Sequence, residues 1–412
     1  MNLIVICSDY PIAKENAESS LLRFQLNSIK KSFEKIILLP TVSLKNKKIL
    51  AGFEHEIIYN FRSFKIFTIL NFIKNSKFLL NDLQKIKFDK TFLNSLSRSI
   101  SVYFKSIFLF TFIEDYFKNQ ENKIENTAIY SFWFNDSTLG ALFFKTKYPK
   151  MKIFSGAHGH DLFAERHVGN RIPFREISIN LIDNVLVCSS EGKQYLDKNY
   201  PRFKNKFTHV NSGISRKAFK AKSSNDGKFR ILTLSRTHPV KRISYLLNIL
   251  KDLDSFADFE IEYYHIGGGQ ELHNLKELSK NLKFKKIKIF FLGKIPDLDL
   301  EFFFKTSPID VFLNVSSSEG TCLSLVEAMS YSAPVLVTEV GGNISIGNYC
   351  STGLSLDFDS KELSNYFKKI YYNKEFREKL KSNSFNYWEK NHSSESLSHK
   401  IDEIFRFICN LK

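Results

Sequence analysis

The chain has 412 residues, of which 43% are hydrophobic, a length that favours two or three domains, each with its own core. Its formal net charge is +17, but the basic residues are spread along the chain, which argues against a nucleic-acid-binding tail or stripe. An anionic membrane surface is the expected charged partner, since residues 1–213 hold 31 Lys and Arg against 19 Asp and Glu. AT-rich coding, which enriches Lys, Asn and Ile, would explain part of the same excess.

Five cysteines are scattered along the chain without a Cys-x-x-Cys pair. This usage predicts a reducing compartment, with neither a disulfide framework nor a zinc site. The N-terminus lacks a basic region and its apolar run is too short for a signal peptide. No run approaches the roughly 18 apolar residues of a membrane span. The sequence therefore predicts a cytoplasmic protein.

The first half alternates short apolar runs with helical patterns, which predicts a parallel sheet with helices on both faces. In such sheets ligands bind beyond the carboxyl ends of the strands, so the loop at 8–18 should face a cleft. The expected strands are 3–7, 35–39, 128–133, 152–155, 184–188 and 207–210, and the expected helices are 17–31, 137–147 and 191–198.

Residues 61–113 interleave aromatic and basic side chains. This pattern is typical of helices that lie in a membrane interface. It is equally typical of core helices with solvated lysines. The sequence leaves both interpretations open.

The expected strand at 152–155 runs into a polar loop with the sequence SGAHGHDLFAERHVGNRIPFR. A loop rich in histidines and acids, directly after a buried strand, is a common place for functional side chains. A metal site is the alternative, but the spacing fits no common ligand pattern.

Residues 214–228 are charged, contain Ser and Gly, and show no periodicity. This composition predicts a linker between two domains.

In the second half, loops that follow predicted strands carry groups suited to a diphosphate. Arg236 follows the strand at 230–234, and Lys241 begins a predicted helix at 241–250. Two cations there can stabilise a leaving diphosphate, whereas without an anion a cation is disfavoured at a helix N-terminus. After the strands at 259–266 and 287–291, glycines permit close approach of the backbone to a ligand. These glycines are Gly267 and Gly268 after the first strand and Gly293, which follows Leu292, after the second.

Asp297 and Asp299 imitate a metal-binding pair of acids. They stand just before a predicted helix, where negative charge is favourable. This position indicates charge at a helix N-terminus rather than a metal site.

The stretch 316–342, SSSEGTCLSLVEAMSYSAPVLVTEVGG, places Glu319 and Glu327 eight positions apart. A helix starting near Gly320 would bring both carboxylates to one side, ready to accept sugar or ribose hydroxyls. Its free N-terminal amides would suit a phosphate. Those amides belong to Thr321, Cys322 and Leu323. The alternative is an amphipathic helix whose two glutamates are only solvated.

With its Glu327-Ala-Met, Ala333-Pro-Val and Gly341-Gly342 segments, this stretch resembles the signature of the retaining glycosyltransferases of family 4. The resemblance implies an α/β chain of the GT-B class, in which two Rossmann-like, doubly wound domains face each other across a cleft. It also implies that Glu319 contacts the donor sugar and Glu327 the ribose. Arg236 and Lys241 would hold the diphosphate, and the backbone at Leu292 and Gly293 would receive the base.

The loop after residue 155 resembles the His-Gly-aromatic-Asp-Leu segment, with a later Glu-Arg and Pro-x-Arg, of family members that build surface polysaccharides. The resemblance implies that His158 lies beside the reacting centre. His160 stands where that subset has an aromatic residue. Two further departures are Ser332 in place of a glycine and the absence of a glutamate directly after Gly342.

These patterns together predict a metal-independent retaining glycosyltransferase without a cofactor. It would move a sugar from a nucleotide-diphosphate sugar to a lipid-linked glycan acceptor, for capsule, O-antigen or exopolysaccharide, at the inner face of the plasma membrane. Residues 1–213 would bind the acceptor and 229–390 the nucleotide sugar, while 391–412 would pack back on the first domain. A GT-B-fold epimerase or phosphorylase, or a non-catalytic nucleotide-sugar-binding protein, remain alternatives.

Overall fold

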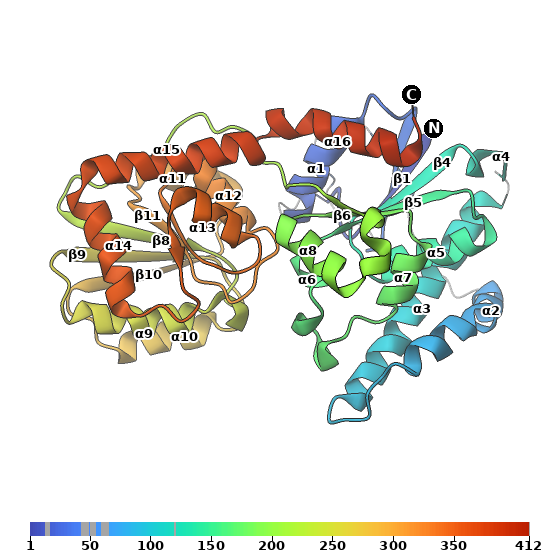
Figure 1. Cartoon of the computed structure of the whole chain (residues 1–412), viewed down its shortest axis with the longest axis horizontal. Helices are drawn as coiled ribbons and strands as arrows, with labels where there is room; N and C mark the ends of the chain where they lie inside the picture. Colours follow the sequence, from blue (N-terminus) through green and yellow to red (C-terminus); the bar gives the residue numbers. More distant parts are fainter. Residues whose placement is uncertain (13–16, 43–48, 50–54, 59–65, 119–120, 412) are drawn as a thin grey trace. The chain divides into compact units, whose positions relative to one another are not determined.

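The computed structural model describes residues 1–12, 17–42, 49, 55–58, 66–118 and 121–411. They form two compact units, one comprising Met1–Asn211 with Ser398–Lys412, the other Ser212–Leu397 (Figure 1). Each unit has a parallel sheet with helices against it, as the alternating pattern predicts.

The sheet of the first unit has seven strands in the order β3-β2-β1-β4-β5-β6-β7. Strand order reverses between β1 and β4, the position at which doubly wound sheets bind ligands. The strands are β1 (Asn2–Cys7), β2 (Lys35–Pro40), β3 (Glu56–Ile57), β4 (Thr127–Ser131), β5 (Lys152–Ala157), β6 (Asn184–Val187) and β7 (Phe207–His209). The two-residue β3 lacks a periodic signal and was not predicted.

The helices of this unit include an unusually close pair, α3 and α5. A Cβ atom on Gly140 of α5 would lie 2.8 Å from the Ser106 carbonyl oxygen of α3, so glycine permits the approach. The helices are α1 (Ala17–Ile29), α2 (Ile66–Leu83), α3 (Phe92–Phe117), α4 (Glu121–Ile124), α5 (Asp136–Lys147), α6 (Gly159–Leu162), α7 (Arg175–Leu181) and α8 (Ser190–Asn199).

Helices α2 and α3 form a hairpin whose turn projects from the sheet (Figure 1). Helix α3 packs Tyr103, Ile107 and Phe110 into the core of the unit. Among the described residues it is the one helix long and apolar enough to cross a membrane, a test that core helices of soluble proteins also pass. In contrast, α2 exposes Ile73 and Leu80. The interpretation as a core helix is therefore confirmed for α3, the membrane-interface interpretation stays a prediction, and residues 61–65 lie outside the description.

The second unit has six strands in the order β10-β9-β8-β11-β12-β13, with the reversal between β8 and β11. The strands are β8 (Lys228–Leu234), β9 (Glu260–Ile266), β10 (Ile287–Gly293), β11 (Val311–Asn314), β12 (Val335–Thr338) and β13 (Gly353–Leu354). The helices are α9 (Ile243–Asp254), α10 (Leu272–Asn281), α11 (Asp297–Thr306), α12 (Leu323–Ser330), α13 (Asn343–Cys350), α14 (Ser360–Tyr372) and α15 (Lys374–Asn391).

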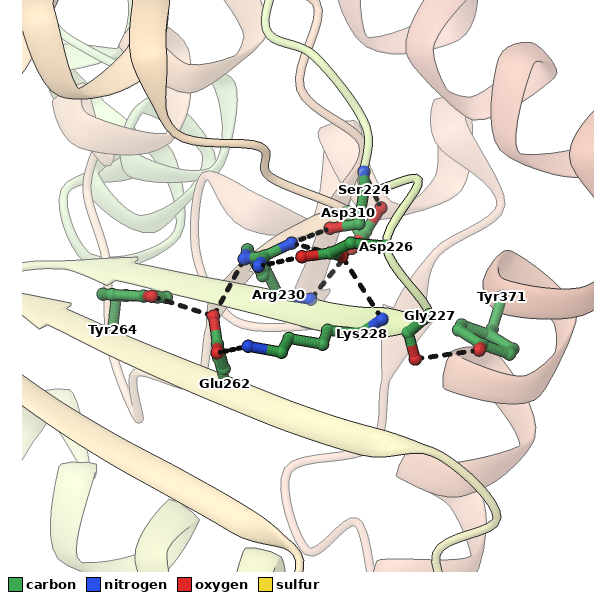
Figure 2. A network of polar contacts seen from close by, with 9 residues as sticks. All are labelled: Ser224, Asp226, Gly227, Lys228, Arg230, Glu262, Tyr264, Asp310 and Tyr371. Carbon is green, nitrogen blue, oxygen red and sulfur yellow. Dashed lines mark hydrogen bonds and ion pairs between the residues drawn. The ribbon is translucent and has the colours of Figure 1, made fainter.

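Residues 214–228, predicted as a linker, are instead an ordered part of the second unit. The Ala221 amide donates to the Tyr331 carbonyl at 2.7 Å, and the Ser224 amide donates to Asp310 at 2.9 Å. Arg230 of β8 then bonds Asp226 and Glu262, as Figure 2 shows. Hydrogen bonds of this kind produce no hydrophobic periodicity in the sequence, so the sequence pattern predicted a linker here.

The last helix, α16 (Ser394–Cys409), contributes its residues from Ser398 onward to the first unit. Phe405 packs against Tyr130 and Phe154, with ring centroids 5.2 and 5.0 Å apart, and Ser28 donates to Ser398 at 3.2 Å.

Candidate active site

Three loops of the second unit meet beyond the carboxyl ends of β8, β9 and β10. The Ser235 amide donates to the Ile266 carbonyl at 3.0 Å, and the Gly267 amide donates to the Gly293 carbonyl at 2.7 Å. Gly267 has a φ of +136°, and a Cβ there would lie 1.8 Å from the Ser235 carbonyl oxygen. Glycine is required at this position, and the predicted loops at Arg236, Gly267–Gly268 and Leu292–Gly293 lie side by side.

Glu319 lies in the loop between β11 and α12 and is 5% exposed. Its Oε1 accepts from Lys241 Nζ at 2.6 Å, Ser316 Oγ at 2.7 Å and Asn314 Nδ2 at 3.3 Å. Asn314 in turn accepts from the buried Asn343 at 3.0 Å. All three of these hydrogen bonds reach one oxygen of the carboxylate, Oε1.

Burial acts to raise the pKa of Glu319, but the Lys241 ammonium and the bonds from Ser316 and Asn314 outweigh it and hold the pKa below its ordinary value of 4.5. A carboxylate with a lowered folded-state pKa stabilises the fold above its unfolded pKa, and this stability is lost as the pH falls through the folded value. Near neutral pH Glu319 is ionised and acts as a hydrogen-bond acceptor.

The helix that carries Glu327 begins later than predicted. Helix α12 starts at Leu323, and Cys322 is its N-cap residue, in an extended conformation, so Gly320 and Thr321 belong to the preceding loop. The Cys322 carbonyl accepts the amides of Leu325 and Val326, which closes the first turn.

Glu327 is half-buried on α12, and its Oε1 lies 3.5 Å from Lys217 Nζ. An ion pair this long is weak, so Glu327 can exchange it for a ligand hydroxyl.

Lys241 lies in a 3₁₀ turn, Pro239–Lys241, ahead of α9. The expected helix start at 241 is therefore wrong by two residues, because Arg242 has a φ of +53° and separates the turn from the helix. The turn directs Lys241 to Glu319. Arg236 is exposed and forms no ion pair or hydrogen bond with residues in the described part of the chain.

His158 follows β5 in the first unit and is the N-cap of α6. Its ring stacks on Phe132, with centroids 4.6 Å apart, and contacts Trp133 edge-on at 5.0 Å. Nε2 lies 3.2 Å from the Phe132 carbonyl oxygen. Because that oxygen can only accept, Nε2 carries the hydrogen in this arrangement.

A cavity of about 610 Å³ lies in the first unit beyond the ends of β1, β4 and β5. Ser8, Trp133 and His160 follow these strands and line it, together with side chains from α3 and α7. His158 is not among its lining residues. The loop at 8–18 therefore reaches a cavity at Ser8, while residues 13–16 lie outside the described part.

Several site residues escaped the sequence analysis. Asn314 and Ser316 hold Glu319, and Arg98, Lys105 and Arg175 line the cavity. Only the Pro-x-Arg segment that ends at Arg175 offered a signal. The others are contributed by segments far apart in sequence, which no local pattern connects.

Acidic residues and histidines are not clustered as metal ligands: no group of three or more His, Cys, Asp or Glu is gathered among the residues that the structure describes. Asp299 is exposed on α11, and the Asp297 side chain lies outside the description.

Residues 215–387 match the family model described as glycosyl transferases group 1. Protein CapJ of Staphylococcus aureus is 25% identical over 181 residues, 42% of this chain and 43% of CapJ. The O-antigen biosynthesis glycosyltransferase WbnH of Escherichia coli is 29% identical over 116 residues, 28% of this chain and 30% of WbnH. The chain thus matches less than half the length of these curated relatives.

Two solved structures resemble the whole chain. The apo form of the lipopolysaccharide outer core galactosyltransferase WaaB has a TM-score of 0.67 at 15% identity and covers 99% of both chains. HepE of Anabaena, crystallised in complex with UDP and glucose, has a TM-score of 0.65 at 13% identity and covers 99% of this chain and 100% of that chain. With two parallel α/β units, the chain thus has the GT-B fold of these structures, and residues 215–387 of its second unit match the family of the glycosyl transferases group 1.

Proposed function

We propose that the protein is a retaining glycosyltransferase that moves a sugar from a nucleotide-diphosphate sugar to a lipid-linked glycan acceptor of a bacterial surface polysaccharide. The observation that carries the proposal is the buried Glu319 carboxylate, held through one oxygen by Lys241 beyond the carboxyl ends of β8 and β11. The family that matches residues 215–387 and the similarity to the O-antigen biosynthesis glycosyltransferase WbnH support it.

In this proposal the bond between the anomeric carbon and the diphosphate oxygen breaks, and a bond to the acceptor hydroxyl forms on the same face. The acceptor proton passes to the leaving phosphate. Arg236 and Lys241 offset the negative charge that grows on the diphosphate, which is the role of preorganised cations in such reactions. The Glu319 carboxylate accepts a hydroxyl of the donor sugar, and Glu327 accepts a ribose hydroxyl.

The test is to measure nucleoside diphosphate release from nucleotide sugars with and without a glycan acceptor. Release that depends on the acceptor supports transfer. Formation of an isomeric sugar would indicate an epimerase, consumption of inorganic phosphate a phosphorylase, and tight binding with no release a binding protein. Thermal-shift screening against nucleotides and nucleotide sugars identifies the donor to use.

The two glutamates should separate binding from turnover. Glu327→Ala is expected to weaken nucleotide binding more than about tenfold, because a lost hydrogen bond to a charged group is worth about 1.5 to 3 kcal/mol. Glu319→Ala, and the isosteric Glu319→Gln, should lower kcat by a similar factor or more with little change in nucleotide affinity. Calorimetry gives the affinities and diphosphate release gives kcat. Wild-type values in both variants would contradict the assignment.

We also propose that the α2–α3 hairpin docks on an anionic membrane. Ile73, Leu80 and Phe88 are 61%, 59% and 91% exposed, and exposed lysines accompany them. These are Lys74, Lys77, Lys85, Lys87 and Lys90. Apolar side chains among lysines suit an interface of acyl chains and acidic headgroups.

Removing three of these lysines should release the protein from anionic vesicles. Lys74, Lys77 and Lys87 changed together to Gln are expected to weaken sedimentation with vesicles about a hundredfold, since each lysine near such a surface contributes about 1 kcal/mol. Lys85 is left unchanged because it pairs with Glu176 at 2.5 Å.

The matched control changes three exposed lysines of the second unit, Lys276, Lys285 and Lys361, to Gln. Equal loss of binding in both triple variants would show that net charge, and not this hairpin, attracts the membrane.

A further inference from the structure

The cavity of the first unit is lined by three cationic side chains, a feature that the donor chemistry does not use. Arg98 and Lys105 come from α3, and Arg175 is the first residue of α7. Two acids, Asp136 and Asp161, also line it.

Arg175 is 7% exposed and only part of its guanidinium is bonded. Nη2 donates to the carbonyls of Asp161 and Phe134, and the group lies over the Phe134 ring at 4.0 Å. Nε and Nη1 are buried and have no hydrogen-bond partner in the described part of the chain. Since buried donors are almost always satisfied, these N–H groups need an acceptor that the chain does not supply.

The segment before Arg175 is held in an unfavourable conformation. Phe174 has a φ of +59°, which a bulky residue rarely adopts, and its amide donates to Asp82 Oδ1 at 2.7 Å. Arg171 pairs with the same aspartate. Backbone strain of this kind persists where surrounding contacts enforce it, and it is commonly found at ligand sites. Here it fixes the side chain that has unsatisfied donors.

The Asp161 carboxylate attracts this guanidinium but bonds neither its Nε nor its Nη1. Both carboxylate oxygens of Asp161 accept backbone amides, from His158 at 2.5 Å and Phe134 at 2.6 Å. Arg98 donates to the ring of His167, whose pKa is lowered to about 4 by burial and by Arg98. His167 is therefore neutral at pH 7 and accepts from Arg98. Lys105 is exposed and forms no ion pair within the described ranges.

We propose that this cavity is the acceptor site and that the acceptor carries an anionic group, a phosphate or a carboxylate, which Arg175 binds together with Arg98 and Lys105. The inference rests on the proposed transferase function and adds a chemical class to its acceptor. A volume of about 610 Å³ is within the range of small-molecule sites, and Trp133 offers an aromatic surface for a sugar ring.

A smaller cavity of about 210 Å³ shares Ser101, Lys105 and Asp136 with the first, and its apolar lining is Phe104, Phe108 and Leu109. These three apolar side chains would accommodate the lipid side of a phosphate-linked acceptor.

The experiment is calorimetric titration of the full chain, saturated with a nucleoside diphosphate so that the second unit is occupied. The probes are glucose 1-phosphate, glucuronic acid and glucose. At least one anionic probe is expected to bind about tenfold or more tightly than glucose, and Arg175→Met, Arg98→Met and Lys105→Met should each remove most of that difference. Preference for the first probe identifies a phosphate, preference for the second a carboxylate.

The control is Arg202→Met, an exposed arginine of the same unit outside the cavity, which should bind all probes as the wild type does. If Arg175→Met lowers Tm, Arg98→Met and Lys105→Met decide the question. Equal affinity for all three probes, or unchanged affinity in these variants, would overturn the proposal. A different outcome is anion binding that depends on the arginines but no release of nucleoside diphosphate with any acceptor. This result would support the anion site and contradict the proposed transferase function.

Discussion

Lys241→Ala is expected to lower kcat by about 10²- to 10³-fold, the usual cost of removing one group that stabilises developing charge. Lys241 Nζ lies 2.6 Å from Glu319, so it both orients this carboxylate and supplies positive charge to the leaving diphosphate. Wild-type activity should survive EDTA, and added magnesium should not rescue the variant. Strict dependence of the wild type on manganese or magnesium would contradict this and direct attention to Asp299.

The same substitution leaves a buried carboxylate without its partner, which by itself costs about 3 to 5 kcal/mol of stability. A loss of activity could then reflect unfolding. The double variant Lys241→Met with Glu319→Gln removes both charges, so it should recover Tm while kcat stays low. Glu319→Gln alone serves as the second control. Recovery of activity together with Tm in the double variant would show that the pair is only structural.

His158→Ala is expected to reduce kcat by roughly a hundredfold or more, in the range of a lost positioned acid–base or hydrogen-bonding group. Nucleotide affinity should stay nearly unchanged, because the residues proposed to bind the nucleotide belong to the second unit and His158 to the first. The measurements are kcat from diphosphate release and nucleotide affinity from calorimetry.

Two neighbouring variants test how His158 acts. His158→Gln retains an N–H that can reach the Phe132 carbonyl, so it should keep the loop in place and the wild-type Tm while activity stays low. His160→Ala should be milder, since this exposed ring stands where the similar segment has an aromatic residue and contacts His167, with centroids 4.8 Å apart. A large loss with His160→Ala and none with His158→Ala would mean that the roles of the two histidines are reversed.

The sequence by itself determined the alternating parallel architecture, because apolar strands and amphipathic helices each produce a hydrophobic pattern within a short stretch of sequence. It predicted β1, β2, β8 and β9 within two residues at each end. It also indicated Glu319 and Glu327, from their spacing and the resemblance of their segment to the family signature, and Arg236 and Lys241, which follow a predicted strand.

Only the tertiary structure decided how these residues are placed. Helices α9 and α12 begin later than predicted because Arg242 and Cys322 adopt backbone conformations outside the right-handed helical region. The periodicity of the side chains does not encode these conformations. Residues 214–228 proved to be ordered, because their hydrogen bonds reach partners far along the chain. The role proposed for Arg175 also depends on tertiary structure. Its burial and its unsatisfied N–H groups arise from packing among α3, α7 and the loops after β4 and β5. No single stretch of sequence contains all of these elements.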